Sequence, residues 1–196
     1  RENKVMSLKT RFGNLGNILD FNNLTEENIY VLNSPILTNN QFEKFVSFFD
    51  KNNKTIDCTF NSDENIESKL NSIKQEAEIY VRQGVTQIIL SDKNVSKENY
   101  PVPMLLCIGA VHTHLTKMKL RGYVSINVQT GEALDTHSFA TLIGVGATTV
   151  NPYLALDSLY QRFEKKLFGK FLYEECVERY VKSVNLGLLK IMSKMG

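Results

Sequence analysis

Hydrophobic residues follow two spacing patterns along this chain, and each pattern predicts one kind of secondary structure. Short β-branched and aromatic runs predict strands, whereas apolar residues three and four positions apart predict amphipathic helices. Strands are therefore expected at 55–60, 86–90, 123–128 and 148–150, and helices at 63–83, 103–119, 136–146, 152–160 and 173–194. Asp63 and Thr136 are the expected N-caps of two of these helices, and Gly84 is expected to end the first.

The first fifty residues lack this regularity. Asn and Gly cluster at 13–17, which predicts a turn-rich loop. Thr38 is expected to cap a short helix with an apolar face formed by Phe42, Phe45, Val46 and Phe49. We therefore divide the chain into an irregular, partly helical N-terminal lead-in, residues 1–54, and a regular domain, residues 55–196.

The regular part alternates strand and helix four times, which limits the fold classes. Its predicted strands are apolar on both faces, as in parallel sheets, whose strands are joined by right-handed crossover helices. Four such units make either half of a (β/α)8 barrel or a small open doubly wound sheet. The sequence therefore predicts an α/β fold with a parallel sheet and flanking helices.

Composition and charge exclude several functional classes. Hydrophobic residues make up 42% of the 196 residues and charged residues 22%, which is typical of a soluble globular protein. Basic and acidic residues are mixed, with a formal net charge of +2, so no basic stripe indicates a nucleic-acid partner. The longest apolar run, residues 104–111, is far shorter than the roughly 20 residues that span a bilayer, so no membrane partner is expected.

The cysteines indicate the cellular compartment. Cys58, Cys107 and Cys176 are odd in number and far apart, which predicts reduced, buried thiols in an intracellular protein rather than disulfides or a zinc site. No secretory signal is visible, so the expected location is the cytoplasm, or a plastid in a plastid-bearing eukaryote. The chain opens at Arg1 and stops directly after a helical pattern, and we expect it to be a segment of a longer protein.

Three polar residues follow predicted strands at the edge where parallel α/β folds gather their functional groups. Asp92, Glu132 and Asn151 each lie in such a loop, so they are expected to converge at one rim. In a functional interpretation Asp92 and Glu132 form an acid/base pair. In a structural interpretation, which we favour, the carboxylates cap helices or bind each other's loops.

Neither a metal site nor a catalytic nucleophile is predicted. His112 and His114 are two residues apart on a predicted helix and point away from each other, whereas joint ligands need a spacing of three or four. His137 has no Cys or His at ligand spacing. No Gly-x-Ser-x-Gly motif occurs, and Cys107 lies inside an apolar helix. We therefore assign no catalytic and no metal-binding residue.

The glycines at 144–146 do not form a dinucleotide fingerprint. That fingerprint follows a strand and opens a helix, whereas here the predicted order is helix, glycines, strand. A C-cap and a tight turn explain the glycines better. Residues 140–150 resemble the last βα unit of FMN-binding barrels, but the next loop contains Pro152, which offers no N–H to a phosphate. We therefore assign no cofactor-binding residue.

Several segments, taken in order along the chain, resemble the central domain of glutamate synthase. The segments that carry the resemblance are Val5-Met6-Ser7-Leu8, 34–39, Ile89-Leu90-Ser91-Asp92-Lys93, 101–103, 109–115, Thr130-Gly131-Glu132-Ala133, 150–156 and 185–196. Some positions depart from the family pattern, since Lys93 replaces a usual Arg and Gln129 a usual Glu. These departures weaken the case for a retained site and leave the resemblance itself intact.

The resemblance implies a large chain with an N-terminal glutaminase domain, this central domain, a synthase barrel that carries FMN and an iron–sulfur cluster, and a C-terminal β-helix. Ammonia released from glutamine would travel inside the protein to 2-oxoglutarate, and flavin would reduce the resulting imine to glutamate. The implied partners are the neighbouring glutaminase and FMN synthase domains, with room for a small electron-donating subunit or domain. In the family the central domain resembles a degenerate flavin barrel, so we expect an incomplete or degenerate (β/α) barrel-like sheet.

Two alternatives from other classes stay open at this point. One is a small stand-alone FMN-barrel oxidoreductase, and the other is a binding module that holds a polar ligand at the rim formed by Asp92, Glu132 and Asn151.

Overall fold

The computed structural model describes residues 6–13 and 29–195. Most of the turn-rich loop predicted at 13–17 lies outside these residues, as do Val5 and Gly196 of the segments that resemble glutamate synthase. A four-stranded parallel sheet forms the centre and has the order β3-β5-β7-β8. Its strands are β3 (Asn53–Asp57), β5 (Gln87–Ser91), β7 (Ser125–Gln129) and β8 (Thr149–Asn151).

The register of this sheet brings apolar residues into rows. One row runs across all four strands through Ile56, Leu90, Val128 and Val150, and all four side chains are buried. Beyond β8 the sheet is extended by a parallel bridge from Ile36 to Val150, with hydrogen bonds on both sides of the bridge. Strands in sequential order, without a closed barrel in the part of the chain that the structure describes, confirm the predicted incomplete barrel-like α/β fold.

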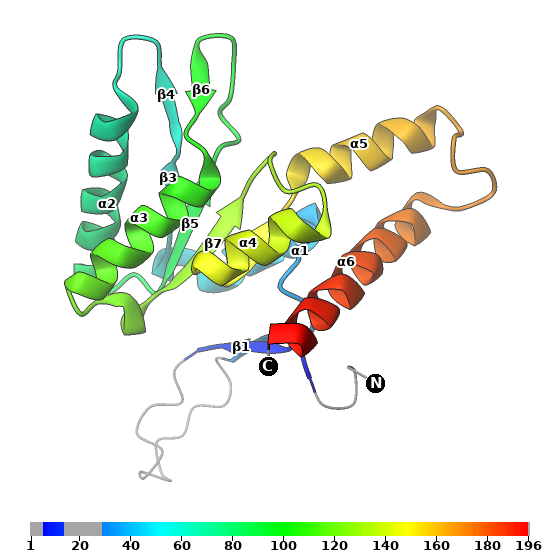
Figure 1. Cartoon of the computed structure of the whole chain (residues 1–196), viewed down its shortest axis with the longest axis horizontal. Helices are drawn as coiled ribbons and strands as arrows, with labels where there is room; N and C mark the ends of the chain where they lie inside the picture. Colours follow the sequence, from blue (N-terminus) through cyan, green and yellow to red (C-terminus); the bar gives the residue numbers. More distant parts are fainter. Residues whose placement is uncertain (1–5, 14–28, 196) are drawn as a thin grey trace, which may run out of the picture.

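Helices pack side by side over the outer face of the sheet, and the row continues beyond the edge of the sheet (Figure 1). The order in space is α2 (Ile66–Arg82), α3 (Met104–Lys117), α4 (Thr136–Val145), α6 (Tyr173–Met195) and α5 (Tyr153–Glu164). The first three place their apolar stripes on the row of sheet residues, and together they form the main core. Helices α5 and α6 form a hairpin that extends to one side (Figure 1).

The inner face of the sheet is covered by the N-terminal part of the chain. Helix α1 (Asn39–Phe49) begins at Thr38, which forms the predicted cap together with Gln41. Strands β1 (Thr10–Phe12) and β2 (Tyr30–Leu32) pair antiparallel beside it. The aromatic rings of this layer pack mostly edge to face around Phe45 and Phe49. In this way α1 occupies the side of the sheet that would be the interior of a complete barrel.

The structure corrects several local predictions. The strand expected at 55–60 breaks at Cys58, because the chain leaves the sheet there and forms an arm, β4 (Thr59–Asn61) paired antiparallel with β6 (Asn99–Pro101). Asp63 and Thr136 are not the helix caps. The caps are Asn65 and Asp135, because the side chains of Asn65 and Asp135 accept hydrogen bonds from backbone N–H groups in the first turns of α2 and α4. Two short 3₁₀ turns, η3 (Asp50–Asn52) and η4 (Arg121–Tyr123), precede β3 and β7. No helix of the described residues is long and apolar enough to span a membrane.

Candidate functional site

The three polar residues predicted at the rim are each engaged in hydrogen bonds within the protein. Asp92 follows β5, Glu132 lies in the loop from β7 to α4, and Asn151 ends β8. Their side chains bond to neighbouring loops, strand ends and helix starts and not to each other. The rim therefore connects the loops at the carboxyl ends of the strands.

Asp92 joins the end of β5 to the loop after β7. Its side chain is 1% exposed, and its two oxygens accept hydrogen bonds from the Thr130 hydroxyl and from the backbone N–H of Gly131. A buried carboxylate is stable only where such donors replace water. The described residues supply these donors, so the Asp92 carboxylate is satisfied by the fold itself.

Glu132 joins the same loop to the start of α3. Its Oε2 accepts a hydrogen bond of 3.1 Å from the backbone N–H of Met104, the first residue of that helix. The N-cap of α3 is Pro103, whose side chain makes no capping bond, so Glu132 provides the cap from a distant loop. Desolvation raises the pKa of Glu132, the Met104 N–H opposes this shift, and the negative charge of Asp92 adds to it.

Asn151 joins β8 to the N-terminal segment. Its Nδ2 donates to the Leu37 carbonyl oxygen and to Asn39 Oδ1, both at 3.0 Å, while its Oδ1 accepts from Gln129. Ser91 donates in turn to Gln129, so this polar chain crosses from β5 to α1. It holds the N-terminal segment against the inner face of the sheet.

A second polar chain on the inner face was missed by the sequence analysis. Asn127 donates to Gln87 Oε1 at 3.0 Å and accepts from the Thr149 hydroxyl at 2.7 Å, and all three residues are buried. The sequence does contain a signal for this polar chain, namely polar residues at even spacing on three strands. They are Gln87 and Ser91 on β5, Asn127 and Gln129 on β7, and Thr149 and Asn151 on β8. Residues two or four apart on a strand share one face.

Tyr153 was not predicted as a rim residue and lies beside Asp92. Burial is the main reason why the pKa of the Tyr153 phenol is raised. The negative charge of Asp92 and a hydrogen bond with Asp92 raise this pKa further. A Cβ atom on Gly131 would lie 3.1 Å from the Tyr153 hydroxyl oxygen and 3.3 Å from a Leu154 methyl group. The loop after β7 is therefore packed tightly on the first turn of α5, which leaves little room for a ligand.

Two of the three histidines contact neighbouring elements, and the third, His137, is exposed on α4. His114 Nε2 lies 2.6 Å from Glu78 Oε2 on α2, and His112 Nδ1 accepts from Arg121 Nε at 3.1 Å. No group of three or more His, Cys, Asp or Glu side chains in residues 6–13 and 29–195 is arranged to hold a metal ion. The three cysteines are free and buried. The pKa of the Cys58 thiol is raised, mainly by a hydrogen bond with the Cys107 thiol and then by desolvation.

Two cavities of the protein lie away from the rim. One, of about 490 Å³, runs between residues 6–8 and α6, and the other, of about 970 Å³, lies at the amino ends of the strands. Neither is lined by Asp92, Glu132 or Asn151.

The residues of this chain do not fit the cofactors of a flavin barrel. The loop after β8 offers Pro152, which has no N–H, and Asn151, whose side chain is already engaged. An iron–sulfur cluster is held by several cysteine thiolates gathered at one place, and the described residues contain no group of three or more Cys, His, Asp or Glu side chains arranged to hold a metal ion.

Comparison with known proteins decides the family. The model of the glutamate synthase central domain matches residues 1–196. The chain belongs to the glutamate synthase central domain family. It is 47% identical over 199 residues to the glutamate synthase (NADPH) large chain of Azospirillum brasilense and 40% identical over 200 residues to that of Bacillus subtilis. It is 37% identical over 218 residues to the ferredoxin-dependent glutamate synthase of Spinacia oleracea.

These glutamate synthases are much longer than the chain. Each comparison covers 100% of this chain and 13% of the relative. The shared part is therefore one domain of the relatives, and it is the part that contains the rim described above.

Proposed function

We propose that this chain is the non-catalytic central domain of a glutamate synthase large chain. In this role it links the glutaminase and FMN synthase domains and helps to wall the path of ammonia. The whole enzyme converts glutamine and 2-oxoglutarate to glutamate, and its FMN and iron–sulfur cluster lie outside this segment. An electron-donating subunit or domain would likewise bind elsewhere in the large chain.

The engagement of the rim residues carries this proposal. A general acid/base pair has to reach a substrate, with the proton-transferring atoms within hydrogen-bond distance. Asp92 is almost fully buried under Thr130 and Gly131, and Glu132 caps α3. Both carboxylates thus serve the scaffold, which argues against a polar-ligand module and favours a structural role in the larger enzyme.

The filled inner face argues against the stand-alone FMN barrel. Helix α1 and its aromatic rings occupy the position of a barrel interior, and the segment at Ile36 takes the place of a fifth strand at the edge of β8. We propose that the described part of the lead-in, residues 6–13 and 29–54, completes the half-barrel formed by the rest of the chain in this way. The inner face of the sheet and the edge at β8 are therefore already covered, and no second half-barrel is needed to cover them.

The proposal is tested in the full-length enzyme by measuring how much ammonia from glutamine escapes. Asp92→Asn and Glu132→Ala loosen the rim loops, because each removes an oxygen that accepts a hydrogen bond there, and neither removes a group that we assign to chemistry. With amide-labelled glutamine, we expect both variants to keep their flavin and their glutaminase step while the share of labelled ammonia released to solvent rises.

The matched control is Asp63→Asn, because Asp63 lies in an exposed turn before α2. It should leave the released share unchanged. If a rim variant remains folded and flavin-loaded but loses glutamine hydrolysis or imine reduction entirely, the rim is catalytic and the proposal is wrong.

A further inference from the structure

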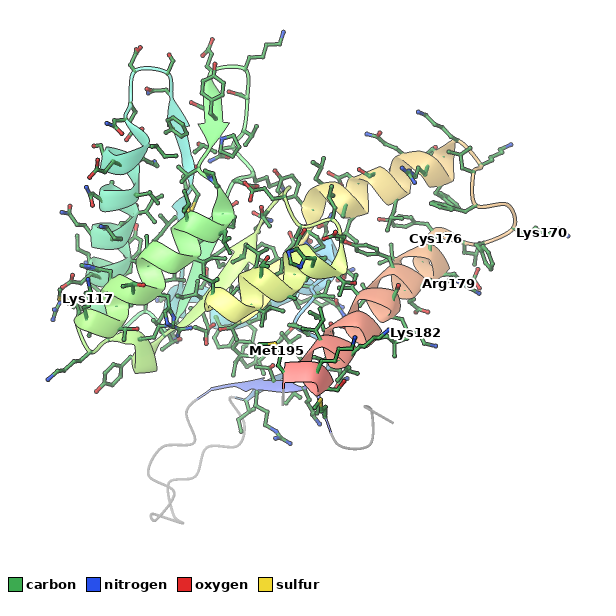
Figure 2. All side chains as sticks on the ribbon, viewed as in Figure 1. Lys117, Lys170, Cys176, Arg179, Lys182 and Met195 are labelled. Carbon is green, nitrogen blue, oxygen red and sulfur yellow. The ribbon has the colours of Figure 1, made fainter. Side chains whose placement is uncertain are left out.

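The turn between α5 and α6 has the properties of a binding surface. We call residues 162–172 the hairpin tip. It lies at the far end of the α5–α6 hairpin, away from the sheet and from α2 and α3 (Figure 1). Lys170 marks it in Figure 2, at the opposite end of the molecule from Lys117.

Hydrogen bonds tie the backbone of the hairpin tip at both ends. The N–H of Lys166 donates to Phe163 O at 2.8 Å, and the N–H of Leu172 donates to Glu175 Oε2 at 2.8 Å. Lys166 and Gly169 have φ values of 56° and 65°, which closes the turn tightly. The tip is therefore preorganised.

Aromatic contacts hold the two helices together below the tip. The ring of Tyr173 packs against those of Tyr160 and Phe163, with centroids 5.4 and 5.9 Å apart. The Arg179 guanidinium lies 4.2 Å from the centre of the Phe171 ring. These contacts position the apolar side chains of the tip but do not bury them.

Three large apolar side chains of the tip stay in solvent. Leu167 is 66% exposed, Leu172 62% and Phe171 43%. Exposed apolar groups on an ordered backbone lose little conformational entropy when they are covered, so they favour association.

The same eleven residues carry excess positive charge. Within residues 162–172 there are four cations, Arg162, Lys165, Lys166 and Lys170, and one acidic residue, Glu164, while Glu175 of α6 accepts a hydrogen bond from the tip backbone. The side-chain ion pairs among the described residues involve Arg82 and His114, and none of these four cations takes part. A surface that combines exposed leucines with unpaired cations complements an acidic surface with an apolar centre.

We propose that the hairpin tip docks on an acidic, partly apolar surface in the part of the parent polypeptide outside residues 1–196. This inference rests on the proposed function, because it requires a larger chain. The chain spans 13% of its relatives, so most of the polypeptide that surrounds this domain lies outside it. A second copy bound tip to tip is a poor partner, because two basic tips repel each other.

A zero-length carbodiimide cross-linker tests the contact in the full-length enzyme. It joins lysine amines to carboxylates that touch them, and mass spectrometry identifies both partners. We expect Lys165, Lys166 and Lys170 to cross-link to Asp or Glu residues outside 1–196, and the yield to fall with added salt. In K166E/K170E the remaining cross-link at Lys165 should fall severalfold.

The control is K117E/K119E, which changes the charge equally at the other end of the molecule. Lys119 matches Lys166 in its left-handed backbone, with a φ of 59°. This variant should leave the cross-links of the tip unchanged. Tip lysines that cross-link to nothing, or only to a separate protein or a second copy, overturn the inference. So does binding to phosphatidylserine vesicles that K166E/K170E abolishes.

Failure of this inference is distinguishable from failure of the proposed function. The cross-link reports contact and does not depend on turnover. If labelled ammonia leaks from the rim variants as expected while the tip makes no contact, only the docking surface is wrong.

Discussion

Glu132 Oε2 accepts a hydrogen bond from the backbone N–H of Met104, 28 residues earlier in the chain, and so caps α3 from the loop after β7. Replacing a capping oxygen costs about 1 kcal/mol in typical helices. We expect Glu132→Ala to lower the free energy of unfolding by about this amount. Urea unfolding at neutral pH measures it. Glu132→Gln, which keeps an acceptor, should recover most of the loss, and Glu98→Ala in the exposed loop before β6 should cost little.

Asp92→Asn should be more costly. The amide keeps only one acceptor oxygen and turns an NH₂ group toward the Thr130 hydroxyl and the Gly131 N–H. Hydrogen bonds to charged groups contribute about 1.5–3 kcal/mol, so we expect a loss of about 2 kcal/mol. The same unfolding measurement tests it. A loss as small as that of the exposed Asp63→Asn would show that the Asp92 bonds contribute little to stability.

Gly187 of α6 allows a close crossing with α4. A Cβ atom at this position would lie 2.5 Å from Thr136 Cγ2, so Gly187→Ala forces the helices apart. Overpacking of this kind costs about 1–3 kcal/mol. Thermal unfolding should show a clear drop in Tm, partly restored by the second change Thr136→Ala. The matched control is Gly144→Ala, where a Cβ atom would meet no neighbouring side chain or packed element within 4 Å, so the new side chain should not destabilise.

Tyr180 gives a prediction about pH. Burial, and then the charge of Asp135, raise its pKa from 10.0 to about 12, while its hydroxyl donates to Leu134 O at 3.1 Å. A raised pKa means that the folded state holds the proton more tightly. The stabilisation is thus complete below pH 10 and is lost as the pH rises from 10 toward 12. Tyr180→Phe should flatten this part of the stability curve, as measured by urea unfolding at several pH values.

The isolated chain should bind no FMN and form no glutamate. Flavin chemistry requires a protein that binds and orients the cofactor, and the loop around Pro152 does not fit that task. A fluorescence titration with FMN and a glutamate assay with glutamine, 2-oxoglutarate and a reductant measure both. Saturable binding at micromolar FMN, or turnover above a control without protein, would contradict the assignment.

The sequence determined the class of fold because its signals are local. The apolar run Ile88-Ile89-Leu90 predicts a strand, and the apolar stripe of α2 predicts a helix. Each pattern lies within its own segment, so it can be recognised without knowledge of the rest of the chain. The cap at Thr38 is also local, since donor and acceptor are three residues apart. For that reason the four strands, the helices on the outer face and the capped helix α1 were predicted close to their observed bounds.

Local signals were less reliable at boundaries. Asp63 and Thr136 are good capping types, but neighbouring Asn65 and Asp135 offer the same chemistry one or two residues away. The strand at 55–60 was expected to be continuous because nothing in its sequence marks the exit of the chain at Cys58. The pairing of β4 with β6, about forty residues later in the chain, creates that exit.

The partners of the rim residues were decided by tertiary structure alone. Sequence placed Asp92, Glu132 and Asn151 at one rim, but it could not say whether their oxygens face a ligand or the protein. That depends on contacts 28 to 114 residues apart in sequence, such as Glu132 with Met104 and Asn151 with Leu37. A hydrogen bond needs two groups within about 3 Å, and only the folded chain brings them that close.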